Sequence, residues 1–139
     1  MSVLVTGGTG FVGSHVVLSL VAAGREVVIA DDGSNSDVCA VLDRLDALVG
    51  HRPKAAVLDV RNTGELVALM RETGVDAIVH LAASKNLRES VTQPWAYYRN
   101  NVVGTRSVVR AAEVTGVRRM VFSSSGSIYG PADQLPIPE

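Results

Sequence analysis

Short apolar runs rich in β-branched residues alternate along this chain with longer segments of helical periodicity. Each such run is suited to a buried strand, and the runs are Val3–Val5, Val27–Ala30, Ala55–Leu58, Ala77–Leu81 and Met120–Phe122. Continuous apolar strands separated by amphipathic helices predict a parallel sheet covered on both faces. Because parallel crossovers are right-handed, the sequence predicts a doubly wound α/β sheet flanked by helices.

The segments between these runs carry helix signals. Their apolar residues recur at helical spacing, and most of the segments run up to a glycine, which commonly ends a helix. Asn62 with Glu65 is typical of a capping box, and Pro94 is suited to a first helical position. We therefore predict helices over residues 11–23, 38–49, 62–74 and 94–112.

The composition is that of one packed domain. The chain has 139 residues, of which 47% are hydrophobic, and a net charge of −1, which gives no electrostatic basis for binding nucleic acid or an anionic membrane. Cys39 is the single cysteine, so no internal disulfide forms, and no apolar run approaches the roughly 20 residues that span a bilayer. The first residues lack the basic start of a signal peptide, and we expect a cytoplasmic domain.

A glycine-rich turn follows the first run. Gly7, Gly10 and Gly13 are spaced by three, between a predicted strand and a predicted helix. Glycines at this spacing allow a tight turn, close approach of the backbone to a pyrophosphate, and close helix–strand packing. The motif is not a P-loop, because Ser14 and His15 stand where lysine and a hydroxyl residue would follow the last glycine. We interpret residues 1–139 as a Rossmann-type dinucleotide-binding domain.

Asp31 closes the second run, 24 positions after Gly7. A carboxylate at this point accepts hydrogen bonds from the adenosine ribose hydroxyls. A 2′-phosphate would meet Asp31 and Asp32 together, and Gly33–Ser36 supplies no lysine or arginine to compensate. The predicted cofactor is therefore NAD rather than NADP. The alternative is a carboxylate in a surface turn.

Other polar residues follow the later runs, at the carboxyl edge where ligands bind in such folds. Asp59 can accept from the adenine amine or cap the next helix, and Lys85 can reach a dinucleotide or remain a solvated loop residue. Ser123–Ser125 can bond a substrate oxygen or form a turn. His80 lies inside an apolar run, so we expect it to be buried. The histidines have no partner set that indicates a metal site, and none is predicted.

At the level of whole motifs, the chain resembles the extended short-chain dehydrogenase/reductase superfamily and, within it, the UDP-glucose 4-epimerases. The resemblance covers essentially the whole chain. It rests on the segments Val3–His15, Asp31 with Asn35–Ser36, Asp59–Arg61, Lys85 with Glu89–Val91, Pro94 with Tyr97–Tyr98, Asn100–Val102, Gly104–Thr105, and Phe122–Ser125 with Tyr129–Gly130.

The resemblance implies a set of cofactor contacts. Phe11 and Val12 would lie at the pyrophosphate, and Asp31, Asp32, Gly33, Ser34, Asn35 and Ser36 around the adenosine ribose. Asp59 and Val60 would lie at the adenine, while Leu81, Ala82, Ala83, Ser84, Lys85 and Asn100 would line the rest of the cofactor. Ser125 would be the catalytic serine beside a UDP-sugar, and the reaction would interconvert UDP-glucose and UDP-galactose through a 4-keto intermediate. A homodimer is a further expectation.

The resemblance also implies a tyrosine base paired with lysine in Tyr-x-x-x-Lys, and these 139 residues do not contain that pair. Asn101, Val102 and Asp133 stand four residues after the tyrosines. We therefore expect the N-terminal portion of a longer enzyme, ending before the catalytic pair and the sugar-binding domain, or a natural short form, with little activity alone. Two alternatives remain open: another NAD-dependent sugar-nucleotide dehydratase, decarboxylase or reductase, and a noncatalytic NAD-sensing module.

Overall fold

The computed structural model describes residues 1–130 and Pro136 and confirms the predicted parallel sheet. Its strands run in the order β3-β2-β1-β4-β5, and all neighbouring pairs are parallel. They are β1 (Ser2–Thr6), β2 (Glu26–Asp31), β3 (Lys54–Val57), β4 (Val75–His80) and β5 (Arg119–Phe122). The order reverses between β1 and β4, because β2 and β3 extend the sheet in one direction and β4 and β5 in the other. This reversal is the switch point at which Rossmann-type sheets bind ligands.

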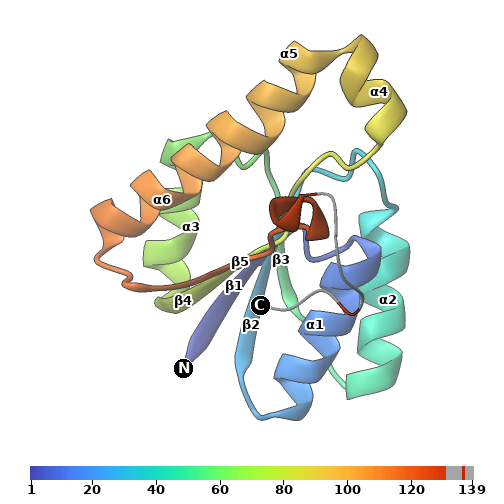
Figure 1. Cartoon of the computed structure of the whole chain (residues 1–139). Helices are drawn as coiled ribbons and strands as arrows, with labels where there is room; N and C mark the ends of the chain where they lie inside the picture. The colour runs from blue at the N-terminus through green and yellow to red at the C-terminus, as the bar shows by residue number, and fades with distance from the viewer. Residues whose placement is uncertain (131–135, 137–139) are drawn as a thin grey trace.

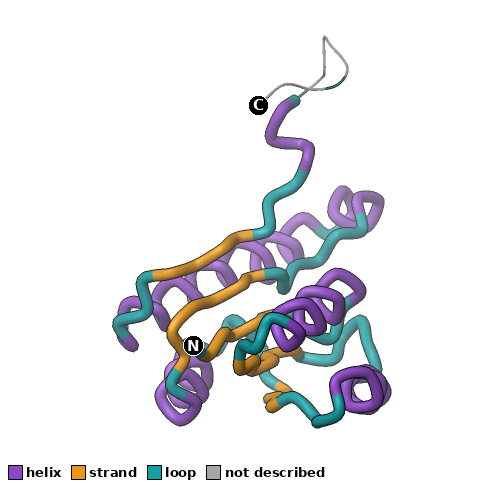
Figure 2. Tube along the Cα trace, turned by 90° about the horizontal axis from the view of Figure 1, so that it is seen from below, coloured by secondary structure: helices purple, strands orange, loops and turns teal. Residues whose placement is uncertain are grey.

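Helices cover both faces of the sheet (Figures 1 and 2). On one face α1 (Phe11–Ala22) packs beside α2 (Val38–Val49), and on the other α3 (Thr63–Thr73) packs beside α6 (Gly104–Thr115). Shorter elements are α4 (Leu87–Thr92), α5 (Pro94–Tyr97), the π-helical η1 (Tyr98–Val103) and the 3-10 helix η2 (Gly126–Tyr129). In the described part of the chain, no helix is long and apolar enough to cross a membrane.

Alternate side chains of the central strands feed two separate cores. Val3 and Val5 of β1 pack with Val17 of α1, whereas Leu4 faces the opposite layer and packs with Leu66 of α3. All five of these side chains are almost completely buried. The period-2 alternation of a strand therefore fills both interfaces of the sheet, which is why the apolar runs are continuous.

The helices at residues 11–22, 38–49 and 63–73 agree with the predicted ones, but the segment after β4 differs. The helix expected to run unbroken from Pro94 is divided into α5, the π-helical η1 and α6. A separate helix, α4, precedes it and was not predicted. It has only six residues, and its large apolar side chains, Leu87 and Val91, are exposed, so the segment is too short for periodicity to indicate a helix. Its start depends on Asn86, whose side chain accepts from the N–H groups of Arg88 and Glu89.

The glycine-rich turn brings the start of α1 against the ends of β1 and β4. Gly7 has a φ of +70°, and a Cβ there would lie 2.7 Å from the backbone nitrogen of Ala82. A Cβ on Gly13 would lie 2.0 Å from the carbonyl oxygen of Gly7 and 2.8 Å from the Cα of Gly8. Only hydrogen fits at Gly13, since the colliding atoms are backbone and cannot move aside.

Gly13→Ala therefore should destabilise the fold, because it forces α1 away from β1. We expect the free energy of unfolding to fall by about 2–4 kcal/mol, in the range of core overpacking plus lost packing. The matched control is Gly64→Ala in α3, where a Cβ would lie 3.5 Å from the side-chain oxygen of Asn62, an ordinary contact. Urea unfolding should show that control unchanged or up to about 1 kcal/mol more stable. Equal stability of Gly13→Ala and the wild type would contradict the packing described here.

Candidate functional site

A cavity of about 520 Å³ opens at the carboxyl ends of the central strands, over the switch point between β1 and β4. Its size is within the range of small-molecule sites. It is lined by the glycine turn, the end of β2 and the segments that follow β3 and β4, through Gly7, Gly10, Phe11, Val12, Gly13, Asp31, Asp32, Ser34, Asn35, Ser36, Leu58, Val60, Leu81, Ala82, Ala83, Ser84, Lys85, Asn86, Glu89, Tyr97 and Asn100. The structure thus brings together most of the residues that the sequence singled out.

The N-terminus of α1 forms one wall of the cavity. Gly10 is the N-cap residue and offers no side-chain acceptor, so the first N–H groups of the helix, those of Phe11, Val12 and Gly13, have no partner within it. A Cβ on Gly10 would approach only the oxygen of Gly7, at 3.3 Å. The Gly10 Cα therefore faces the open cavity, and this wall presents free donors and the positive end of the helix dipole to an anion.

Asp31 joins the glycine turn to the loop after β2. One carboxylate oxygen accepts from the N–H of Thr9 and the other from the N–H of Gly33, each at 3.0 Å. The Thr9 hydroxyl also bonds the Ser36 hydroxyl, at 2.7 Å. Gly33 itself does not line the cavity; with a φ of +70° it turns the loop back beneath Asp31. This end of the cavity carries the carboxylates of Asp31 and Asp32. Arg61 does not line the cavity, but its pKa is raised by its hydrogen bond to Asp59 and also by the carboxylate of Asp32, which is near enough to act on it.

The opposite wall is held together by amide groups. The Asn101 side chain accepts from the N–H of Ser84 at 2.8 Å and donates to the Ser84 carbonyl at 3.0 Å. Asn100, one residue earlier, donates to the Ser84 hydroxyl at 3.0 Å. The loop after β4 is therefore attached to the π-helical turn η1, and Ser84 and Asn100 both face the cavity.

Four lining residues were missing from the candidate set: Leu58, Asn86, Glu89 and Tyr97. The Tyr97 hydroxyl donates to the Glu89 carboxylate at 2.8 Å. The pKa of Tyr97 is raised, first by loss of hydration and then by this hydrogen bond, so the hydroxyl keeps its proton. Glu89 and Tyr97 belong to the quoted motifs, yet nothing local assigns them to the cavity, because they meet only once α4 folds back on α5.

Asp59 and Ser125 do not line the cavity. The Asp59 carboxylate accepts from the Arg61 side chain, with Nε at 2.9 and 2.8 Å from its two oxygens. The Arg61 guanidinium holds the pKa of Asp59 below its ordinary value. Ser125 is exposed in the loop after β5, where its carbonyl accepts from the N–H of Ile128 at 3.3 Å. Figure 2 shows the adjoining η2 standing apart from both helix layers.

His80, expected to be buried, is 2% exposed at the end of β4. Its Nδ1 lies 2.6 Å from the hydroxyl of Thr6 on β1, and its Nε2 lies 3.0 Å from the hydroxyl of Thr105 on α6. Burial lowers the pKa of His80 to about 4, so the imidazole is neutral near pH 7. Among the described residues, no group of three or more acidic, histidine or cysteine side chains is arranged to hold a metal ion.

The geometry of this cavity is that of the Rossmann-type dinucleotide-binding class, in which the pyrophosphate lies on a glycine turn and helix N-terminus and a carboxylate follows the second strand. The model of the NAD dependent epimerase/dehydratase family matches residues 3–139, and the chain belongs to that family.

Curated relatives carry the name UDP-glucose 4-epimerase. One from Klebsiella pneumoniae is 38% identical over the whole chain, which covers 99% of that relative. UDP-glucose 4-epimerase 4 from Oryza sativa subsp. japonica is 43% identical over 99% of this chain, which covers 38% of it. Apart from the Klebsiella protein, the chain spans about 40% of the length of the curated relatives it matches.

Solved structures agree with this relationship. A UDP-glucose 4-epimerase from Stenotrophomonas maltophila, with bound NAD and formylated UDP-arabinopyranose, superposes with a TM-score of 0.96 at 39% identity. The match includes 99% of this chain and 40% of the Stenotrophomonas chain. One from Bifidobacterium longum, in complex with NAD⁺ and UDP, gives a TM-score of 0.95 at 34% identity. That match includes 100% of this chain and 41% of the Bifidobacterium chain. The chain therefore has the fold of the NAD-binding portion of these enzymes.

The lowered pKa of His80 predicts how stability depends on pH. The unfolded chain takes up a proton near pH 6.5, whereas the folded chain does so only near pH 4. The contribution of His80 is thus fully present above pH 6.5 and is lost as the pH falls toward 4, by about 3 kcal/mol in total. Urea unfolding of His80→Gln across this range should show a shallower pH dependence than the wild type. His51→Gln, at an exposed histidine, should leave the dependence unchanged; parallel curves for His80→Gln and wild type would refute the assignment.

Proposed function

We propose that this chain is the NAD-binding part of a UDP-hexose 4-epimerase, which interconverts UDP-glucose and UDP-galactose through a 4-keto sugar. The observation that carries the proposal is the cavity itself. It has a donor-lined wall at one side, two carboxylates at one end, and an amide-lined wall at the other. The related structures with bound NAD, one of them also holding a UDP-sugar derivative, support this assignment.

Each wall of the cavity suits one part of the dinucleotide. The free N–H groups of Phe11, Val12 and Gly13 would hold the pyrophosphate, and Asp31 would accept from the adenosine ribose hydroxyls. Val60 lines the cavity where the adenine would lie, with Asp59 as a proposed contact at its rim. The loop Leu81–Lys85 and Asn100 would enclose the nicotinamide half. Bound NAD would supply the hydride acceptor for oxidation at C4 of the sugar and the donor for its reduction.

Ser125 is the proposed substrate-side residue. A serine hydroxyl at the carboxyl edge of the sheet can hydrogen-bond the C4 oxygen of the sugar and orient its proton. It cannot replace a tyrosine base, because an unassisted serine hydroxyl is too weak an acid. We propose that a Tyr-x-x-x-Lys pair, which these 139 residues do not contain, completes the site; the paired lysine lowers the pKa of the tyrosine from about 10 toward neutrality.

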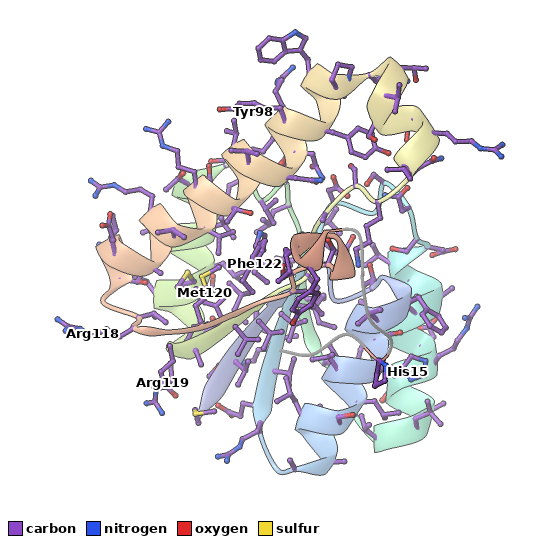
Figure 3. The ribbon with its side chains drawn as sticks, viewed as in Figure 1. His15, Tyr98, Arg118, Arg119, Met120 and Phe122 are labelled. Carbon is purple, nitrogen blue, oxygen red and sulfur yellow. The ribbon has the colours of Figure 1, made fainter. Side chains whose placement is uncertain are left out.

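A homodimer is also proposed, through the outer side of the helical segment from Pro94 to Thr115. Trp95, Tyr98 and Val102 are 75%, 51% and 50% exposed. These aromatic and apolar side chains lie three and four residues apart, so they share one face of the helix. Tyr98 points outward from this segment in Figure 3. Exposed apolar patches of this kind are typical of protein–protein contacts.

Cofactor choice is the first test. We expect NAD to bind at least about tenfold more tightly than NADP, because the 2′-phosphate would be placed beside two carboxylates. Asp31→Asn, which removes the charge but keeps an acceptor, should narrow the difference. Isothermal titration calorimetry measures both affinities, with Gly10→Val as the non-binding control, since its side chain would project into the cavity. Equal or tighter binding of NADP by the wild type would overturn the assignment.

Catalysis by Ser125 is tested in a chimera in which this chain replaces the matching part of the Neisseria gonorrhoeae UDP-glucose 4-epimerase, to which it is 40% identical. The chimera should convert UDP-galactose to UDP-glucose, whereas the 139 residues alone should not. Ser125→Ala should lower kcat by about 10²–10⁴, the usual contribution of positioned proton transfer, without weakening NAD binding. Ser123→Ala is the matched control. Full turnover by the Ser125→Ala chimera would remove Ser125 from the mechanism.

A further inference from the structure

A network of hydroxyl and imidazole groups, buried at Thr6 and His80 and partly buried at Thr105, runs from the sheet into α6, and its hydrogen bonds have a fixed direction. The Thr105 hydroxyl donates to the carbonyl of Asn101 at 2.6 Å, so toward His80 it can only accept. The Nε2 of His80 therefore carries the proton, and its Nδ1 is a bare acceptor for the Thr6 hydroxyl at 2.6 Å. Thr6 in turn accepts from the N–H of Ala82, at 3.5 Å. Every donor in this hydrogen-bond network has a partner, and one tautomer of His80 is selected.

The hydrogen-bond network extends beyond the core to the cavity. Asn101, whose carbonyl receives the Thr105 hydroxyl, clamps the backbone of Ser84 through both groups of its side-chain amide. Ser84 and its other partner, Asn100, face the cavity. Asn100 and Asn101 lie on η1, and π-helical turns of this kind often occur at functional sites because they redirect side chains that an α-helix would point elsewhere.

We propose that His80 and Thr105 are positioning residues for the half of the cavity that lies beyond β4. They hold η1 in the position, relative to β4, at which Asn100 and Ser84 form the wall of that half. The inference rests on the proposed binding of NAD and extends it, because it assigns the geometry of the nicotinamide side to residues that touch no ligand. The adenosine side depends on a different set of contacts, those of Asp31 with Thr9 and Gly33.

Thr115 shows what Thr105 would do if its hydroxyl served the helix alone. Both threonines lie on α6, and both donate to the carbonyl four residues earlier, Thr115 to Ala111 at 2.8 Å. Both are partly buried. Only Thr105 also accepts from His80, so the two threonines form a matched pair that separates the local helix contact from the link to the sheet.

The test compares Thr105→Val with Thr115→Val by calorimetric titration of NAD and of ADP, which fills the adenosine and pyrophosphate part of the cavity but not the rest. We expect Thr105→Val to bind NAD about tenfold more weakly, the equivalent of one lost hydrogen bond, and ADP as the wild type does. Thr105→Ser should restore NAD binding, and Thr115→Val should change neither affinity. Unchanged NAD binding by Thr105→Val, or an equal loss for NAD and ADP, would overturn the proposal.

A second measurement uses the wild-type chain and does not depend on how a variant folds. Nitrogen NMR of the imidazole should show the proton of His80 on Nε2, and the His80 signals should shift when NAD is added but not when ADP is added. A proton on Nδ1, or no response to NAD that binds, would overturn the positioning role while leaving NAD binding intact. A wild-type chain that bound ADP but not NAD would refute the proposed function itself.

Discussion

The close approach of the α1 N-terminus to β1 and β4 is the constraint on which the rest of the structure depends. It exists because Gly13 has no side chain: a Cβ there would lie 2.0 Å from the Gly7 oxygen. The approach packs Val17 into the core and at the same time aims the free N–H groups of the helix into the cavity. Packing and ligand binding are therefore consequences of one contact. A larger residue at Gly13 would disturb the core, whereas Gly10, one turn earlier, meets mainly open space and belongs to the cavity.

Asp31 has two physical roles that reinforce each other. Its carboxylate accepts from the N–H groups of Thr9 and Gly33, which fixes the glycine turn relative to the loop after β2. Carboxylate oxygens have more lone pairs than these two bonds use, so the same group can also accept from a ribose hydroxyl. Charge selection against a 2′-phosphate and preorganisation of the phosphate-binding turn therefore come from a single side chain. This coupling explains why removing the charge and removing the side chain are different experiments.

The parallel sheet and most of the residues that line the cavity could be predicted from sequence because their signals are local. The periodicity of the apolar residues identifies the strands and helices. The spacing of the glycines identifies the turn, because only a few backbone geometries satisfy it. The carboxyl edge then follows from parallel topology, which placed Asp31 and the residues around Ser84 at one site. The direction in which a side chain points, in contrast, is not determined by the local sequence pattern. The Arg61 guanidinium binds the Asp59 carboxylate, a contact that the sequence did not indicate, and Leu58 and Val60, on either side of Asp59, line the cavity.

The segment after β4 shows the physical limit of reading periodicity. From Pro94 onward the sequence carries an ordinary helical pattern, and an unbroken α-helix would satisfy all its backbone groups. The structure adopts a π-helical turn instead, in which Asn101 clamps Ser84, and in the first turn of α6 that follows it Thr105 meets His80. These partners lie 17 and 25 residues away. A polar side chain in a helix reveals such a bond only when its distant partner is in place, so the tertiary hydrogen bonds, and not the local propensity, decide the geometry of this wall of the cavity.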